Sequence, residues 1–263
     1  MSSPTELAER SMELLARAHS EIVENLPDGW TDSPDDTAGL FQTALFAECM
    51  SFSLAIRECL SERLVGPANA LGRTLTDLVM MLVYMAHDPS RAQQLTIQYW
   101  WKETNREIEL TKRASALHGI DITERLNSLN GLLERLRARA DELGMTKIKK
   151  PPDTASLAKA IGANEQTTKH ALSILSGSVH PGLSALSRRL VSDEAGNRIT
   201  PREDNPAELV KTATLAAVAM ADGAAAVARL QDWETAQNLG DLSDRVSDEA
   251  HNLSSAASDE APT

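Results

Sequence analysis

Two polar pairs in this 263-residue sequence combine residue types that could do chemistry with a spacing that would bring them together. Ser176 and His180 are one helical turn apart, and the proline after His180 places it at a helix end. A serine beside a histidine is the pair that a hydrolase uses as nucleophile and base. No GxSxG turn surrounds this serine and no acidic residue close in sequence orients the histidine. We therefore favour a structural histidine that joins helix ends through hydrogen bonds.

Arg73 and Asp77 form the second pair, and they lie inside the most apolar stretch of the chain, residues 64–89. At about 100° per residue they share one stripe of a helix with Tyr84. Ionised groups removed from water cost several kcal/mol unless they are paired. Arg73 and Asp77 are therefore expected to bind each other or a group on a neighbouring helix.

The two pairs are expected to meet, because each lies on an apolar helix where an unpaired polar group costs about 1–3 kcal/mol. The candidate polar cluster comprises Arg73, Asp77, Tyr84, Ser176 and His180. Such a cluster could bind a ligand or could only lock the helices together, and the sequence leaves both open.

Metal, cofactor and disulfide chemistry find little support in the sequence. The motifs GxxxxGK[ST], GxGxxG, HExxH and CxxC are missing, so no cofactor is expected. His87, His170 and His180 could share a metal only if the two polar helices meet, and packing is the favoured interpretation. Cys49 and Cys59 are expected to be reduced core thiols, because ten helical residues separate them by about 15 Å.

Composition favours helices throughout the chain. Hydrophobic residues make up 42% of the sequence and aromatic residues only 3%, with alanine and leucine prominent. We predict an all-α bundle of many helices around a long, buried central helix over residues 64–89, within a single domain of residues 1–239. Residues 190–200 could form a very short β-hairpin. The acidic, serine-rich segment 240–263 is predicted to be disordered. The expected helices cover residues 4–26, 37–64, 64–89, 89–117, 123–143, 155–161, 164–179 and 206–239.

Charge and hydropathy restrict the expected partners. The net charge of −12 argues against binding to DNA or to an anionic membrane. The sequence has neither a secretory leader pattern nor an apolar run near the roughly 20 residues that cross a bilayer, so we expect a cytoplasmic protein. Tyr99, Trp100 and Trp101 lie among basic residues, as in a base-stacking platform for RNA, but glutamates are interleaved with them. Core or dimer packing is therefore favoured for these aromatic side chains.

Three segments resemble the motifs of a bacterial, all-helical family of unknown function. RTLTDLVMMLVYMAHDP resembles an R-x-x-x-E helix that continues to Y-x-x-x-D-P, with Asp77 at the position of the glutamate. ASLAKAIG and LSGSVHPG resemble a segment that contains S-x-x-x-H-P, and Ser176 and His180 match its serine and histidine. The resemblance covers roughly residues 41–190. That family in turn resembles the HEPN (higher eukaryote and prokaryote nucleotide-binding) superfamily.

The HEPN superfamily includes toxin and antiviral ribonucleases, so the resemblance implies a metal-independent endoribonuclease in stress or phage defence as an alternative function. Its motif is an arginine and a histidine with four to six residues between them. Arg113 and His118 fit this spacing at an expected helix end, and Arg245 and His251 fit it in the acidic segment. We favour coincidence for both, and a regulatory or structural module as the function. Dimers are common in the superfamily, and a homodimer through the Tyr99 helix and the alanine-rich last helix is expected.

Overall fold

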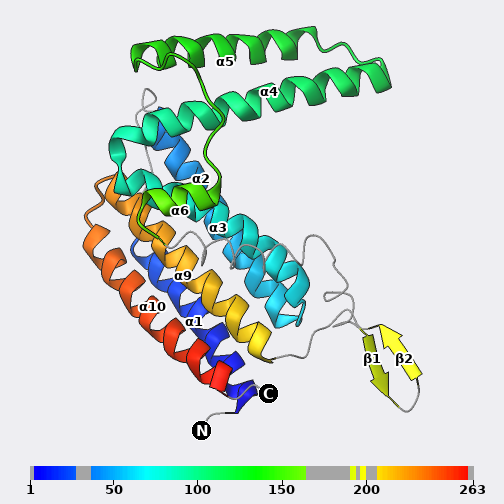
Figure 1. Cartoon of the computed structure of the whole chain (residues 1–263), viewed down its shortest axis with the longest axis vertical. Coiled ribbons are helices and arrows are strands. Elements are labelled where there is room, and N and C mark those ends of the chain that lie inside the picture. The colour runs from blue at the N-terminus through cyan, green and yellow to red at the C-terminus, as the bar shows by residue number, and fades with distance from the viewer. Residues whose placement is uncertain (1–2, 28–36, 164–189, 194–195, 200–205, 260–263) are drawn as a thin grey trace.

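The computed structural model describes residues 3–27, 37–163, 190–193, 196–199 and 206–259, and these residues are helical apart from one short hairpin and the connecting loops (Figure 1). The predicted all-α fold is thus confirmed. The helices are α1 (Pro4–Glu24), α2 (Thr37–Ser61), α3 (Val65–His87), the 3₁₀ turn η1 (Pro89–Arg91), α4 (Ala92–His118), α5 (Thr123–Glu142), α6 (Thr154–Ala160), α9 (Pro206–Leu230) and α10 (Ala236–Asp259), and the strands are β1 (Leu190–Asp193) and β2 (Gly196–Ile199).

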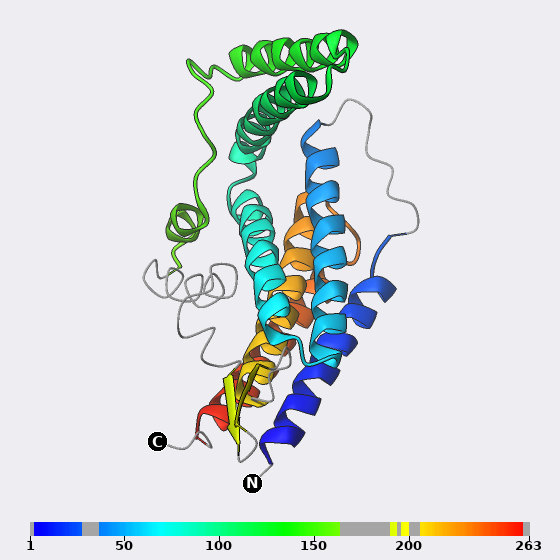
Figure 2. The ribbon, with the colours of Figure 1, turned by 90° about the vertical axis from the view of Figure 1, so that its right-hand side faces the viewer.

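Five of these helices, α1, α2, α3, α9 and α10, pack side by side into a bundle (Figures 1 and 2). Helix α9 contacts the other four, so α9 and not α3 holds the middle position. Its alanines and Gly223 allow this close packing, since a Cβ on Gly223 would lie only 3.2 Å from Cγ2 of Val79 on α3. Helix α3 was expected at the centre, but it leaves one side partly exposed, where Arg73 and Asp77 lie.

Local signals set several helix ends where the sequence predicted them. Ser3 and Glu6 form a capping box at α1, in which the backbone N–H of Ser3 donates to the Glu6 carboxylate at 2.7 Å. Helices α4 and α5 are followed by Gly119 at φ 65° and Gly144 at φ 68°, a left-handed conformation that suits glycine. The expected hairpin is also present, with β1 antiparallel to β2 and Leu190 opposite Ile199.

The end of the chain differs from the sequence prediction. The last helix was expected to run to residue 239, yet α9 ends at Leu230, and the chain turns through Asp232 at φ 52° before α10 begins. Residues 240–259 were predicted to be disordered, and this was wrong, because they belong to α10. An apolar stripe at helical spacing gives α10 a buried face against α9 and α1, while its acidic residues face outward. The buried stripe consists of Leu239, Leu242, Val246, Ala250 and Leu253.

Helices α4 and α5 form a hairpin that projects from one end of the bundle (Figures 1 and 2). We call residues 92–150, which contain this hairpin and the chain after it, the arm. The arm has a small core of its own in which Ile97, Leu136 and Ala140 are buried. Trp101 packs against this core. The arm is therefore a thin two-helix unit beside the thicker bundle.

Two described helices, α2 over Ala38–Ser61 and α9, are long and apolar enough to cross a membrane by length and composition alone. In α9, 67% of the apolar window is buried inside the protein, and the core helix of a bundle has the same property. The expectation that the protein does not bind a membrane stays a prediction.

Candidate functional site

Arg73 and Asp77 pair as their spacing predicted. Nε of Arg73 donates to Oδ2 of Asp77 at 3.2 Å, and the hydroxyl of Thr154, the first residue of α6, donates to Oδ1 of Asp77. Asp77 thereby ties α6 to α3. The prediction that this cluster is buried was wrong, because the two side chains keep 28% and 39% of their surface exposed. The short helix α6 covers this side of α3 only in part.

Tyr84 does not join that pair. It follows Arg73 by eleven residues, or about 16 Å along the helix. Its side chain is buried, and its hydroxyl oxygen accepts a hydrogen bond from Nη1 of Arg91 at 3.2 Å. Nε of Arg91 also pairs with Asp88 at 2.7 Å. Tyr84 therefore holds the turn that connects α3 to the arm. The predicted partners Ser176 and His180, like His170, lie outside the described residues.

The ribonuclease candidates Arg113 and His118 are both exposed near the far end of α4. They are five positions apart, so they point about 140° apart around the helix and do not face one common site. The second candidate pair lies on α10, where Arg245 bonds to Glu21 of α1 at 2.7 Å. Arg245 is thus engaged in an ion pair that joins α10 to α1.

The aromatic residues at the start of the arm have packing roles. Tyr99 and Trp100 both contact Phe41 of α2. The centroid of the Phe41 ring is 5.2 Å from that of Tyr99 and 6.3 Å from that of Trp100. Nζ of Lys102 lies 5.7 Å from the centre of the Tyr99 ring. These contacts attach α4 to the bundle, as the packing interpretation expected, and Trp100 keeps 39% of its surface exposed.

Among the residues that the structure describes, no group of three or more histidine, cysteine or acidic side chains could hold a metal ion. Both cysteines are free, and burial raises the pKa of the Cys49 thiol to about 12. A thiol with so high a pKa stays protonated at neutral pH and is a poor nucleophile.

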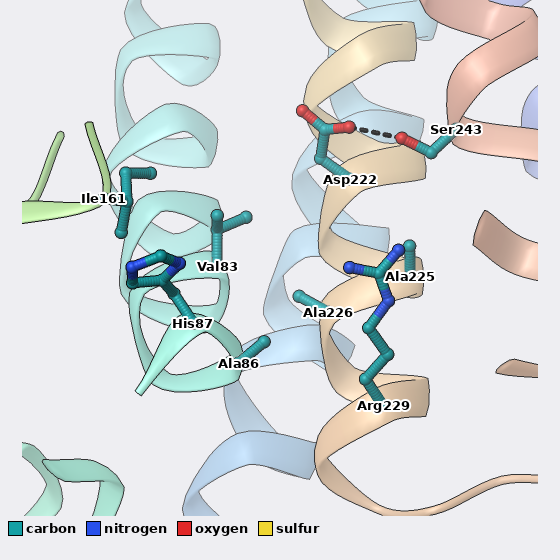
Figure 3. Close-up of a pocket in the computed structure, with 9 residues that line it drawn as sticks. All are labelled: Val83, Ala86, His87, Ile161, Asp222, Ala225, Ala226, Arg229 and Ser243. Carbon is teal, nitrogen blue, oxygen red and sulfur yellow. Dashed lines mark hydrogen bonds between the residues drawn. The ribbon is translucent and has the colours of Figure 1, made fainter. Parts of the chain in front are cut away.

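A cavity of about 450 Å³ opens between α3, α9 and α10, next to the residue that ends α6 (Figure 3). We call it the Asp222 cavity. Its floor comes from α9, because Asp222 and Arg229 are two turns apart on the same face, with small alanines between them. Since the alanines do not fill the gap between α3 and α10, space remains above them. The lining consists of Val83, Ala86, His87, Ile161, Asp222, Ala225, Ala226, Arg229 and Ser243.

Asp222 is the partly buried charged group of this cavity. Its Oδ1 accepts a hydrogen bond from the hydroxyl of Ser243 at 2.5 Å, and within the described chain it has no ion-pair partner. Burial raises the pKa of its carboxyl group, and the nearby charge of Asp244 adds to this, whereas the Ser243 hydrogen bond and the charge of Arg229 lower it. The carboxylate is thus held in a place that disfavours its charge.

Arg229 supplies the opposite charge. Its side chain is exposed, and within the described residues it makes neither an ion pair nor a hydrogen bond. Figure 3 shows the guanidinium beside Ala225, on the same side of α9 as Asp222 and across the cavity from His87. The guanidinium also lies near Gly240 of α10, where an added Cβ would be 3.5 Å from Nη2 of Arg229, an ordinary contact distance.

A second hollow of about 480 Å³ continues along α9 from the Asp222 cavity, and Asp222 lines both. Thr76 and Met80 of α3 form one wall of the second hollow, and Ser254 of α10 belongs to the other. The face of α9 between α3 and α10 is therefore a groove with one carboxylate near its middle. Sequence reasoning missed this site, although an aspartate inside the alanine-rich run AMADGAAAVAR was a visible signal.

The protein is thus an all-helical bundle with a polar cavity beside its central helix, α9. Residues 41–198 match the model of a family of unknown function, DUF5677, and because this match covers more than half of the chain, the protein belongs to that family. Neither the curated proteins nor the solved structures give a match. The matched region contains Arg73, Asp77 and Tyr84 but not Asp222 or Arg229. The HEPN resemblance gains no support from these comparisons.

Proposed function

We propose that this protein is a cytoplasmic regulatory module that binds a small amine in the Asp222 cavity. The observation that carries the proposal is a partly buried carboxylate that faces a cavity of about 450 Å³ and has one hydroxyl as its hydrogen-bond partner among the described residues. Cavities with apolar walls and a few convergent polar groups are typical ligand sites, and a perturbed carboxyl group adds to that pattern.

An amine suits this lining for two reasons. Its ammonium group would pair with Asp222 and offset the cost of holding a carboxylate away from water. Its carbon chain would lie on the apolar side chains around the acid, among them Val83, Ile161 and Ala225. A neutral ligand would leave the carboxylate unpaired.

Binding is favoured over catalysis because the polar groups are arranged wrongly for hydrolysis. The Ser243 hydroxyl donates its hydrogen bond directly to Asp222, so no histidine lies between the serine and the acid as it does in a hydrolase. His87 lies across the cavity on α3. With no base on the serine, this site lacks an activated nucleophile.

A regulatory role follows from the position of His87. It is the last residue of α3, directly before the turn into the arm, and the neighbouring Arg91 ties this turn to Tyr84. A ligand that contacts His87 and α9 at once would hold the end of α3 against the bundle. Binding would thereby favour one position of the arm over others.

Isothermal titration calorimetry with hexylamine tests the proposal. The full chain should bind hexylamine at neutral pH, and Asp222→Asn should weaken the affinity at least about tenfold, because the variant keeps the shape of the cavity but loses its charge. Asp248→Asn, an exposed position on α10, is the matched control and should bind as the parent protein does. Equal affinity for the parent and Asp222→Asn, or no binding at millimolar amine, would refute the proposal.

A ribonuclease is the weaker alternative, since only the resemblance supports it and Arg113 and His118 point apart. Purified protein is expected to leave mixed RNA intact, and the variants His118→Ala and His180→Ala would assign any cleavage to one histidine.

A homodimer stays a proposal too. The alanine-rich face of α9 is already covered by other helices of the same chain, so a dimer contact would lie on α4 near Trp100.

A further inference from the structure

The Asp222 cavity has two ends of opposite charge. At one end the Asp222 carboxylate accepts its hydrogen bond from Ser243. At the other end stand Arg229 from α9 and His87 from α3, one on each side of the opening (Figure 3). The other lining residues near these groups are small and apolar, namely Val83, Ala86, Ala225 and Ala226.

The two charged residues do not satisfy each other. Their Cα atoms are about 10 Å apart along the helix axis. The guanidinium reaches back beside Ala225 (Figure 3), yet within the described residues no ion pair or hydrogen bond joins it to Asp222. The attraction of Arg229 is the smallest of the influences on the pKa of Asp222, as expected for charges that are not in contact. Each end of the cavity is thus free to pair with a group of a bound molecule.

From this arrangement we propose that the ligand is bipolar: a chain molecule that carries an ammonium group for Asp222 and a carboxylate for Arg229, with a short apolar spacer between them. The inference rests on the proposed function, which assigns the ammonium end to Asp222. Arginine suits the other end because its planar guanidinium can bind a carboxylate through two hydrogen bonds. The spacer would lie on Ala225 and Ala226.

An α-amino acid with a plain side chain fits this lining less well, because it carries both charges on one carbon atom. ω-Amino acids separate the charges by a chosen number of methylene groups and so measure the distance between the two ends. We therefore use 4-aminobutyrate and 6-aminohexanoate as probes, with butylamine and hexylamine as amines of matched length and hexanoate as the acid alone.

Calorimetry on the full chain gives the test. At least one of the two ω-amino acids should bind about tenfold or more tightly than the amine of its own length, because it adds a charge-assisted contact to Arg229. Arg229→Gln should abolish that advantage, which is measured on the variant as the ratio of its affinities for the ω-amino acid and for the amine of the same length. Arg10→Gln, an exposed position on α1, serves as the control and should keep the advantage.

The outcomes separate the two proposals. If the amines bind and the ω-amino acids gain nothing, or if the gain persists in Arg229→Gln, the bipolar ligand is refuted while amine binding stands. If neither class binds, both proposals fail. Binding of hexanoate as tight as that of 6-aminohexanoate would also overturn the inference, since the ammonium end would then contribute nothing.

Discussion

The bundle and the arm are built from helices of similar length but differ in how many partners each helix has. In the bundle, α9 is enclosed by four other helices, and its alanines are buried on most sides. In the arm, α4 and α5 mainly have each other, and only three core residues there, Ile97, Leu136 and Ala140, are buried together. The bundle can therefore enclose a cavity, whereas a two-helix arm cannot.

The bundle and the arm also differ in net charge. The arm, residues 92–150, has 11 lysines and arginines against 8 acidic residues, a net charge of +3. The whole chain has 26 basic and 38 acidic residues, so the remainder, with 15 and 30, carries −15. The acidic remainder includes the helices that hold Asp222, which agrees with a ligand that brings a positive group. The overall charge of −12 is therefore an average over two unlike regions.

The largest expected effect comes from removing α10 from the bundle. Truncation after Glu234 would remove the buried side chains of Leu239, Leu242, Val246 and Leu253 and expose the surfaces of α9 and α1 that they cover. Burial of one such side chain contributes about 1.5–3 kcal/mol. The sum approaches the whole stability of a domain, about 5–15 kcal/mol. The truncated chain should lose its cooperative thermal transition in circular dichroism. Truncation after Asp259 is the control, and an unchanged melting curve for the shorter chain would contradict the account.

A matched pair of leucine truncations compares the two cores. Leu82→Ala, at a bundle position that is 0% exposed, should cost about 3–5 kcal/mol in urea unfolding, because close neighbours cannot collapse into the space. Leu136→Ala, at an arm position that is 6% exposed, should cost about 2 kcal/mol. Hydrogen exchange should show faster opening confined to the arm in the second variant. Equal losses in both would mean that the arm is as tightly packed as the bundle.

A smaller effect is expected from neutralising the buried acid. The pKa of Asp222 is raised in the folded protein, so the folded state binds a proton more readily than the unfolded chain, and the charged form weakens stability at neutral pH. Asp222→Asn should therefore raise the melting temperature at pH 7. The gain should shrink as the pH falls through the raised pKa. Asp244, Arg229 and His87 face the same region, so each variant is compared with its parent at every pH.

Asp141→Asn, at an exposed position of the arm, should change the melting temperature little at any pH. A gain of equal size for the arm variant would show that the effect comes from overall charge and not from burial of Asp222.

The smallest effects come from two helical glycines, one in each region. Gly131 of α5 has open space around a new Cβ, with the nearest atom 3.9 Å away on flexible Arg135, so Gly131→Ala should stabilise by about 0.4–1 kcal/mol. Gly223 of α9 would place that Cβ 3.2 Å from Val79, and the crowding should offset the gain or reverse it. Chemical unfolding of both variants decides, and a clear stabilisation at Gly223 would indicate a looser bundle core.

The sequence predicted best what depends on near neighbours in the chain. The ends of α1, α4 and α5 follow from Ser3, Gly119 and Gly144, each of which acts within one turn. The pairing of Arg73 with Asp77 was likewise predictable, because residues four apart on a helix are neighbours. These features need no knowledge of the fold.

Features that depend on distant partners were missed. The order of α10 comes from its contacts with α9 and α1, and its alanines, serines and scattered leucines resemble a disordered segment when read alone. The exposure of Asp77 follows from how little of α3 the short α6 covers. The Asp222 cavity exists because α3 and α10 stand on either side of α9, and spacing within one helix does not reveal that arrangement.

Hydrogen exchange with and without 6-aminohexanoate tests the proposal that the bundle, and not the arm, holds the ligand site. At a saturating concentration, exchange should slow in the segments that line the Asp222 cavity, residues 83–91, 219–231 and 240–247, and stay unchanged in the far part of the arm, residues 105–135. In Asp222→Asn, which should bind at least about tenfold more weakly, this protection should be reduced at the same ligand concentration. Protection confined to the arm, or equal protection in the parent and the variant, would contradict the account.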